Sequence, residues 1–144
     1  MAVNHRTLAG LIPHSGAMCL LEDVVRMDEE SITCRAVSHR DPEHPLREEG
    51  ILPALSGIEY AAQAMAVHGA LLEARGSRPG MLAAVREIVL SVERLDDIVE
   101  DLEITARRLL GDSRRLLYEF EVHAGTRQLL RGRAAVVLDA EETL

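Results

Sequence analysis

Two polar side chains four residues apart, Glu59 and Gln63, interrupt a stretch of sequence that is otherwise small and apolar. The stretch covers residues 57–72 and reads GIEYAAQAMAVHGALL. Residues four apart lie on the same face of a helix. A buried Glu and Gln both need hydrogen-bond partners, and an enclosed polar pocket supplies them better than packed alkyl groups do. The pair therefore indicates acid–base chemistry or ligand binding.

A structural interpretation of Glu59 competes with the functional one. Ser56 precedes Glu59 by three residues, and Ser-x-x-Glu is the capping-box pattern of a helix N-terminus. The helix dipole also favours an acidic residue in the first turn. Capping does not account for Gln63, which lies one turn further along the same face. Spacing alone leaves both interpretations open.

His14 is the second candidate for chemistry. It lies in LIPHSGAMCLLEDV (residues 11–24), directly after Pro13 and just before Gly16, in an irregular segment that leads into an apolar run. A surface histidine in a loop is the alternative. No His, Cys, Asp or Glu residues have the spacing of a zinc or iron site, so we expect neither a metal nor another cofactor. No nucleophile elbow and no phosphate-binding loop occur either.

Composition narrows the class of protein. The 144 residues fit one domain, 1–144, and the net charge is −8 with no lysine in the chain. An acidic chain with few aromatic rings is a poor nucleic-acid binder. Cys19 and Cys34 are too few for a disulfide framework, and we expect both to be buried. No signal peptide or membrane-spanning run is evident, so we expect a cytoplasmic protein.

The elements that must position these residues follow from periodicity. Residues 18–38 predict two strands around the acidic turn 28–30, and residues 39–50 read as a loop. Residues 56–72 predict a helix that is apolar on all sides and therefore buried. Four strand-length segments follow in residues 80–140, with hairpin turns at Gly111–Asp112 and Gly125–Thr126. We expect an α+β fold: an antiparallel sheet of about six strands, the last four in a meander, wrapped around one central helix.

Two of these segments carry a resemblance to a known family. LIPHSGAMCLLEDV resembles the opening motif of hot-dog-fold 3-hydroxyacyl-[acyl-carrier-protein] dehydratases, and LPALSGIEYAAQAMA resembles their central helix, Pro-x(5)-Glu-x-x-Ala-Gln-Ala. GMLAAVREIVLSVERL is similar to the strand that follows. Gly-Ile-Glu-Tyr-x-Ala-Gln is typical of the subgroup associated with aryl-polyene biosynthesis. The resemblance extends over residues 8–139.

The resemblance implies a hot-dog dimer with active sites at its interface. It implies dehydration of a 3-hydroxyacyl thioester on acyl carrier protein to the trans-2-enoyl thioester, in fatty-acid-like or polyene biosynthesis. The resemblance implies a catalytic role for Glu59, which we expect to be the acid, and our hypothesis for the base is His14. The usual Gly-His-Phe-Pro stretch ahead of the helix is missing here, and His44 is the alternative base. We expect the substrate to contact Ser56, Gly57, Tyr60 and Gln63.

Other functions and partners stay open at this point. A hot-dog thioesterase would use an acidic residue to activate water, and a non-catalytic subunit would complete a heterodimer with a true dehydratase. Either a homodimer or such a heterodimer is expected. An acidic carrier protein would need a local arginine patch. The candidates for this patch are Arg78, Arg86, Arg107, Arg108, Arg114 and Arg115.

Overall fold

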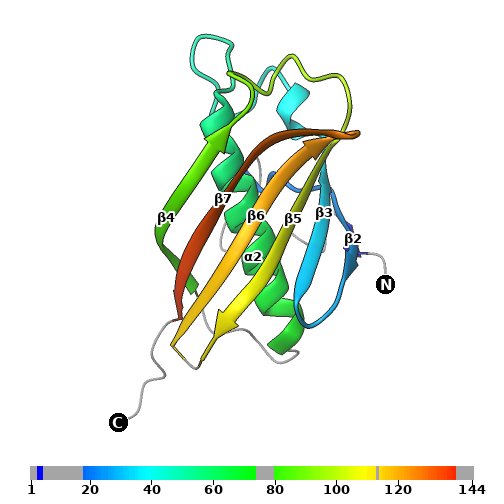
Figure 1. Cartoon of the computed structure of the whole chain (residues 1–144). Helices are drawn as coiled ribbons and strands as arrows, with labels where there is room; N and C mark the ends of the chain where they lie inside the picture. Colours follow the sequence, from blue (N-terminus) through cyan, green and yellow to red (C-terminus); the bar gives the residue numbers. More distant parts are fainter. Residues whose placement is uncertain (1–2, 5–17, 74–79, 113, 139–144) are drawn as a thin grey trace.

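A single antiparallel sheet curls around one helix in the computed structural model, which describes residues 3–4, 18–73, 80–112 and 114–138 (Figure 1). The strands are β1 (Val3–Asn4), β2 (Asp23–Met27), β3 (Ser31–Ala36), β4 (Gly80–Leu90), β5 (Leu102–Gly111), β6 (Arg115–Ala124) and β7 (Arg127–Leu138). The helix is α2 (Gly57–Glu73), and two 3-10 turns are η2 (Ser38–Arg40) and η3 (Ala54–Ser56). The predicted α+β architecture is confirmed, with the two-residue β1 added to the expected six strands.

Helix α2 is buried on all sides, as its sequence predicted. Pro53 precedes the turn η3, and the helix begins directly after Ser56, the position expected of an N-cap. None of residues 57–72 is exposed. The helix packs under β3, β5 and β6, and residues one or two turns apart along it face the sheet core, such as Tyr60, Ala64 and Val67.

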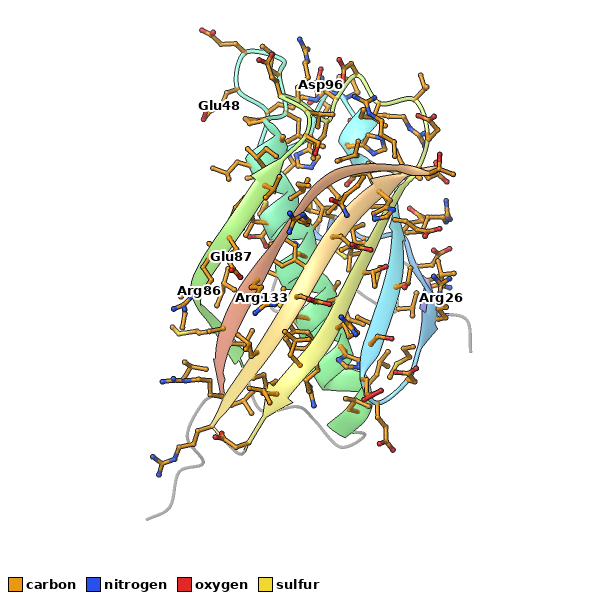
Figure 2. All side chains as sticks on the ribbon, in the orientation of Figure 1. Arg26, Glu48, Arg86, Glu87, Asp96 and Arg133 are labelled. Atoms are coloured by element: carbon orange, nitrogen blue, oxygen red, sulfur yellow. The ribbon has the colours of Figure 1, made fainter. Side chains whose placement is uncertain are left out.

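The two faces of the sheet follow the alternation of the strand sequences. Ile32, Cys34 and Ala36 on β3 are fully buried on the face toward α2, and Leu102, Ile104 and Ala106 on β5 repeat the pattern. The outer face carries charges instead, including ion pairs from Arg107 to Glu119 and from Arg133 to Glu87. Figure 2 shows Glu87 on β4 beside Arg133 on the neighbouring β7.

The predicted turns are confirmed by their hydrogen bonds. The carboxylate of Asp28 accepts from the amides of Glu30 and Ser31, which closes the β2–β3 turn. Asp112 accepts in the same way from Arg114 and Arg115 at the β5–β6 turn. The β6–β7 turn places Gly125 at a φ of 61°, a conformation that glycine adopts without steric cost.

The expected meander is wrong for its first strand. The sheet order is β1-β2-β3-β5-β6-β7-β4, so β4 pairs with β7 at the far edge and not with β5. The chain returns from β4 to β5 through residues 91–101. Leu95 in this loop donates to the carbonyl of Leu52, and Asp96 accepts from the amide of Leu52. This connection is a crossover over the start of α2 and not a hairpin.

Strand β4 leaves apolar side chains exposed at the open edge of the sheet. Five of its large apolar residues are between 37% and 71% exposed: Met81, Leu82, Val85, Val89 and Leu90. Within the described residues β4 pairs on one side only, with β7. An apolar edge strand with unpaired backbone groups is a surface for another strand.

The start of α2 packs so closely on β7 that only glycine fits at position 57. A Cβ added to Gly57 would lie 2.5 Å from the buried side chain of Leu130. We expect Gly57→Ala to lower the free energy of unfolding by about 1–3 kcal/mol, the usual cost of overpacking, as measured by urea denaturation. Gly69→Ala is the matched control, because nothing lies within 4 Å of its added Cβ. It should raise stability by about 0.5–1 kcal/mol through helix propensity, and equal effects at both positions would contradict this packing.

Candidate active site

Gln63 uses its buried amide to join the helix to the segment before β2. Its side chain is 1% exposed. Its Oε1 accepts from the amide of Leu20 at 2.9 Å, and its Nε2 donates to the carbonyl of Met18 at 2.6 Å. The same Nε2 lies 3.3 Å from Oε2 of Glu59. Substrate contact by Gln63 stays a prediction, and the structure shows its amide bonded to Glu59.

Glu59 lies on the more open side of α2. It is partly buried, as are Ile58, Ala62 and Ala66, which follow the same side of the helix. The predicted pairing of Glu59 with Gln63 on one face is confirmed by their hydrogen bond. The arrangement places a carboxylate, held by a neutral amide donor, at the end of an apolar stripe. Such a group can exchange a proton with a substrate that lies along the stripe.

Tyr60, for which substrate contact stays a prediction, is fully buried. Its hydroxyl lies 2.7 Å from Oγ of Ser38 and 3.0 Å from Nε2 of His44. Ser38 in turn donates to the carbonyl of Leu20 at 2.8 Å. Both partners of the Tyr60 hydroxyl are therefore protein groups, and burial raises the Tyr60 pKa well above its usual range. Tyr60 supports the site from inside the fold.

The two histidines proposed as base have different placements. His14 lies outside the described residues. His44 is 5% exposed, and its Nδ1 accepts from the amide of Leu46 at 3.0 Å while its Nε2 bonds Tyr60. Burial lowers the His44 pKa and the nearby Arg47 lowers it further, so this ring is held neutral. Both ring nitrogens of His44 are occupied within the protein, which argues against its use as base.

The amides of Ser56 and Gly57 are engaged within the turn that leads into the helix. Ser56 donates to Pro53, and Gly57 donates to Ala54 and Leu55. Binding of a thioester oxygen by these amides stays a prediction. The positive end of the helix dipole lies at the start of α2 and can still attract an anion.

A second buried tyrosine–histidine pair lies further along α2. His68 is fully buried, its Nδ1 accepts from the Tyr118 hydroxyl at 2.7 Å, and its Nε2 donates to the carbonyl of Asp28 at 2.8 Å. Arg108 donates to the same hydroxyl and lies over the Tyr118 ring. As predicted from its angle around the helix, His68 points away from Glu59. Because Arg108 points inward and bonds Tyr118, we no longer consider it for carrier-protein docking.

The other arginines considered for docking differ in exposure. Arg86, Arg114 and Arg115 are exposed, while Arg107 is paired with Glu119 and Arg78 lies outside the described residues. A hollow of about 800 Å³ opens on the outer sheet face, lined partly by these charges, including Arg107, Glu119 and Arg133. The sheet separates this hollow from α2, so it is not the site built around Glu59.

Further observations concern metals and membranes. Within residues 18–73, 80–112 and 114–138, the side chains of His, Cys, Asp and Glu form no group that could hold a metal ion. In the same part of the chain no helix has the length and apolar content needed to cross a bilayer. Cys19 and Cys34 are buried thiols, as predicted, and burial raises the pKa of Cys34 to about 12.

Sequence reasoning missed Ser38 and the hydroxyl of Tyr60 as supports of the site. Ser38 follows a predicted strand and has no motif around it, and its bond to Tyr60 spans 22 residues. The sequence did indicate that the Tyr60 hydroxyl is hydrogen-bonded, because Tyr60 adjoins Glu59 in an apolar helix where a hydroxyl needs a partner. That signal does not say whether the partner is substrate or protein.

A helix wrapped by a curled antiparallel sheet defines the hot-dog class, and comparison with solved structures agrees. A chain of the ApeI:P dehydratase heterocomplex from Xenorhabdus doucetiae superposes with a TM-score of 0.83 at 26% identity, covering 93% of this chain and 91% of that one. The thioesterase HI1161 from Haemophilus influenzae gives 0.69 at 10% identity, covering 97% and 93%. AziG from S. sahachiroi gives 0.65 at 16% identity, covering 89% and 97%. The latter two show the fold alone.

The sequence assigns the family within this class. Residues 6–143 match the ApeP-like family of ApeP dehydratases, and the chain belongs to that family. No curated protein matches the chain at a significant level.

Stability should fall as the pH falls from 8 toward 5.5. Burial lowers the pKa values of His39, His44 and His68 in the folded state. The neutral rings therefore contribute stability that is complete above the unfolded pKa of about 6.5 and is lost as the pH falls through the folded values. Urea midpoints measured across this range should decline, and His44→Gln should flatten the decline because one titrating ring is gone. An unchanged slope in that variant would contradict the role given to burial of His44.

Proposed function

We propose that this chain dehydrates a 3-hydroxyacyl thioester, carried on acyl carrier protein, to the trans-2-enoyl thioester. The observation that carries the proposal is the partly open carboxylate of Glu59, oriented by Gln63 at the end of an apolar stripe, in a member of a dehydratase family. An acyl chain needs an apolar path that ends at a proton-transfer group, and this side of α2 provides both.

Each step of the elimination requires a positioned group. A base removes the α-proton, an acid protonates the departing hydroxyl, and growing negative charge on the thioester oxygen is stabilised. We assign the acid to Glu59, which Gln63 orients at the end of the apolar stripe, and the base to His14. Positioned acid–base groups contribute roughly 10²–10⁴-fold each. The positive end of α2 near Ser56 and Gly57 supplies the electrostatic stabilisation.

A second hot-dog subunit completes the assembly in this proposal. The apolar edge of β4 would pair with the corresponding strand of that subunit and continue the sheet. The related ApeI:P protein is a dehydratase heterocomplex, which supports a partner of different sequence as well as a second copy of this chain. Exposed Arg86, Arg114 and Arg115 are available to an acidic carrier protein. We place the assembled enzyme in the cytoplasm, in fatty-acid-like or polyene biosynthesis.

Removing the acid of Glu59 tests the reaction. Glu59→Gln keeps the size and hydrogen bonding of the side chain, so the fold should survive while turnover falls by at least about 10²-fold. Mass spectrometry of a 3-hydroxyacyl carrier protein incubated with each protein measures the loss of one water. Glu103→Gln is the matched control, since Glu103 is exposed on the outer face of β5, and it should keep full activity.

The mass spectra also separate the competing functions. Release of the acyl group in place of water loss would identify a thioesterase. An unchanged substrate, when an established dehydratase converts it, would identify a subunit that needs a catalytic partner. Full activity in Glu59→Gln would overturn the assignment of the acid.

Pairing through β4 is tested by the mass of the protein in solution. The chain has a mass of 15.8 kDa, so light scattering should give about twice that value if two copies pair. Val85→Asp places a charge on the apolar edge and should yield monomers, because a buried unpaired carboxylate is costly. Val99→Asp is the control, since Val99 is 79% exposed in a loop away from the edge. A monomeric unmodified chain would exclude the homodimer and leave the heterodimer.

A further inference from the structure

Three backbone groups of one short segment are held by side chains and not by a neighbouring strand. The segment is Met18–Leu20, which precedes β2. Gln63 bonds the carbonyl of Met18 and the amide of Leu20, and Ser38 donates to the carbonyl of Leu20. Cys19 and Leu20 are 3% and 1% exposed. Backbone groups buried this deeply require partners, and here two side chains supply them all.

The hydroxyl of Ser38 is the last group in a series of hydrogen bonds that begins at His44 and passes through Tyr60. Ser38 spends its one proton on Leu20, so it must accept from the hydroxyl of Tyr60. Tyr60 then accepts from Nε2–H of His44, whose Nδ1 is already an acceptor for Leu46. Each O–H or N–H group in this series of hydrogen bonds therefore has only one acceptor to which it can donate. Removing the hydroxyl of Tyr60 therefore leaves Oγ of Ser38 without its donor and Nε2–H of His44 without its acceptor.

The same segment is coupled to the acid of the site. The Nε2 group that holds the carbonyl of Met18 also donates to Glu59. Tyr60 and Gln63 come from the same turn of α2. Gln63 bonds both ends of the segment, and Tyr60 reaches Leu20 through Ser38. Met18 follows His14 by four residues in the sequence. The helix turn that carries Glu59 and the segment that leads away from His14 are thus held together by one hydrogen-bond network.

We propose that Tyr60 and Ser38 are positioning residues, whose hydroxyl chain, together with Gln63, locks the segment Met18–Leu20 against the helix turn that carries Glu59. This inference rests on the proposed function for its catalytic meaning. Displacing reacting groups by a fraction of an ångström to an ångström costs one to two orders of magnitude in rate. Loosening this lock should therefore lower kcat more than it changes KM.

The chain contains its own reporter of the lock. Cys19 lies in the middle of the held segment, while Cys34 is fully buried at the centre of β3. Modification of Cys19 by a thiol reagent requires the segment to open locally, whereas modification of Cys34 requires opening of the sheet. Peptide mapping by mass spectrometry distinguishes the two thiols. The ratio of their labelling rates thus measures the lock without any reference to activity.

Tyr60→Phe is the test variant and Tyr118→Phe is its matched control. Each change removes one buried hydroxyl that is bonded to a buried histidine. Tyr60 lies on α2 and bonds His44, whereas Tyr118 lies on β6 and bonds His68 of α2. Tyr60→Phe should raise the Cys19 labelling rate relative to Cys34 by about tenfold or more. It should also lower kcat at least about tenfold, with KM changed less than twofold. Tyr118→Phe should change neither ratio, even if it destabilises the protein.

A second pair of variants tests the same proposal if Tyr60→Phe folds poorly. Ser38→Ala removes the last hydroxyl of the chain and should increase Cys19 labelling, while Ser38→Thr keeps a hydroxyl and should restore protection and kcat. Unchanged Cys19 labelling in both Tyr60→Phe and Ser38→Ala would overturn the proposal, as would equal effects from Tyr118→Phe. If the unmodified chain shows no dehydration with or without a partner, the proposed function fails. The labelling ratio then still decides whether the hydroxyl chain holds the segment.

Discussion

The structure depends on the burial of a helix that carries polar groups in its interior-facing surface. No residue of α2 between Gly57 and Leu72 is exposed, so the hydroxyl, amide and imidazole of Tyr60, Gln63 and His68 must be bonded to protein groups or destabilise the fold. Their partners come from every part of the chain around the helix: the segment before β2, the turn η2, the loop that follows it, the β2–β3 turn and β6. The polar groups of the helix thereby determine where these segments lie, and apolar packing fills the space between.

This constraint separates the residue that we propose to perform chemistry from those that hold it. Glu59 is the one acidic residue between Gly57 and Leu72 of the helix, and it lies on the more open side. The neighbouring Tyr60 and Gln63 are turned inward and support it. In this helix the hydroxyl of Tyr60 and the amide of Gln63, which lie next to the carboxylate, are both bonded to protein groups. Solvent exposure distinguishes the two roles, and the pattern of residue types does not.

Local patterns predicted most of the secondary structure but not the way it assembles. The buried helix, the six main strands and the turns at Asp28, Asp112 and Gly125 follow from periodicity and turn chemistry, which act over a few residues. The place of β4 was mispredicted because sequential strands were assumed to pair, whereas the crossover loop 91–101 carries the chain past the helix start. In the site, spacing predicted that Glu59 and Gln63 share a face. It could not predict that Ser38 or Leu20 would be their distant partners, because those contacts depend on tertiary packing.

The sheet order also has a consequence for biosynthesis. Strand β4 leaves the ribosome before β5, β6 and β7, yet its partner within the sheet is β7, which begins at Arg127, 37 residues after Leu90 ends β4. Until β7 emerges, β4 has neither edge paired, and its apolar side chains have no cover. Non-local strand pairing of this kind is slow and exposes chains to aggregation during folding. Early binding of a chaperone or of a newly made subunit would therefore reduce aggregation of the nascent chain. The timing of subunit synthesis then affects how much of this protein folds correctly.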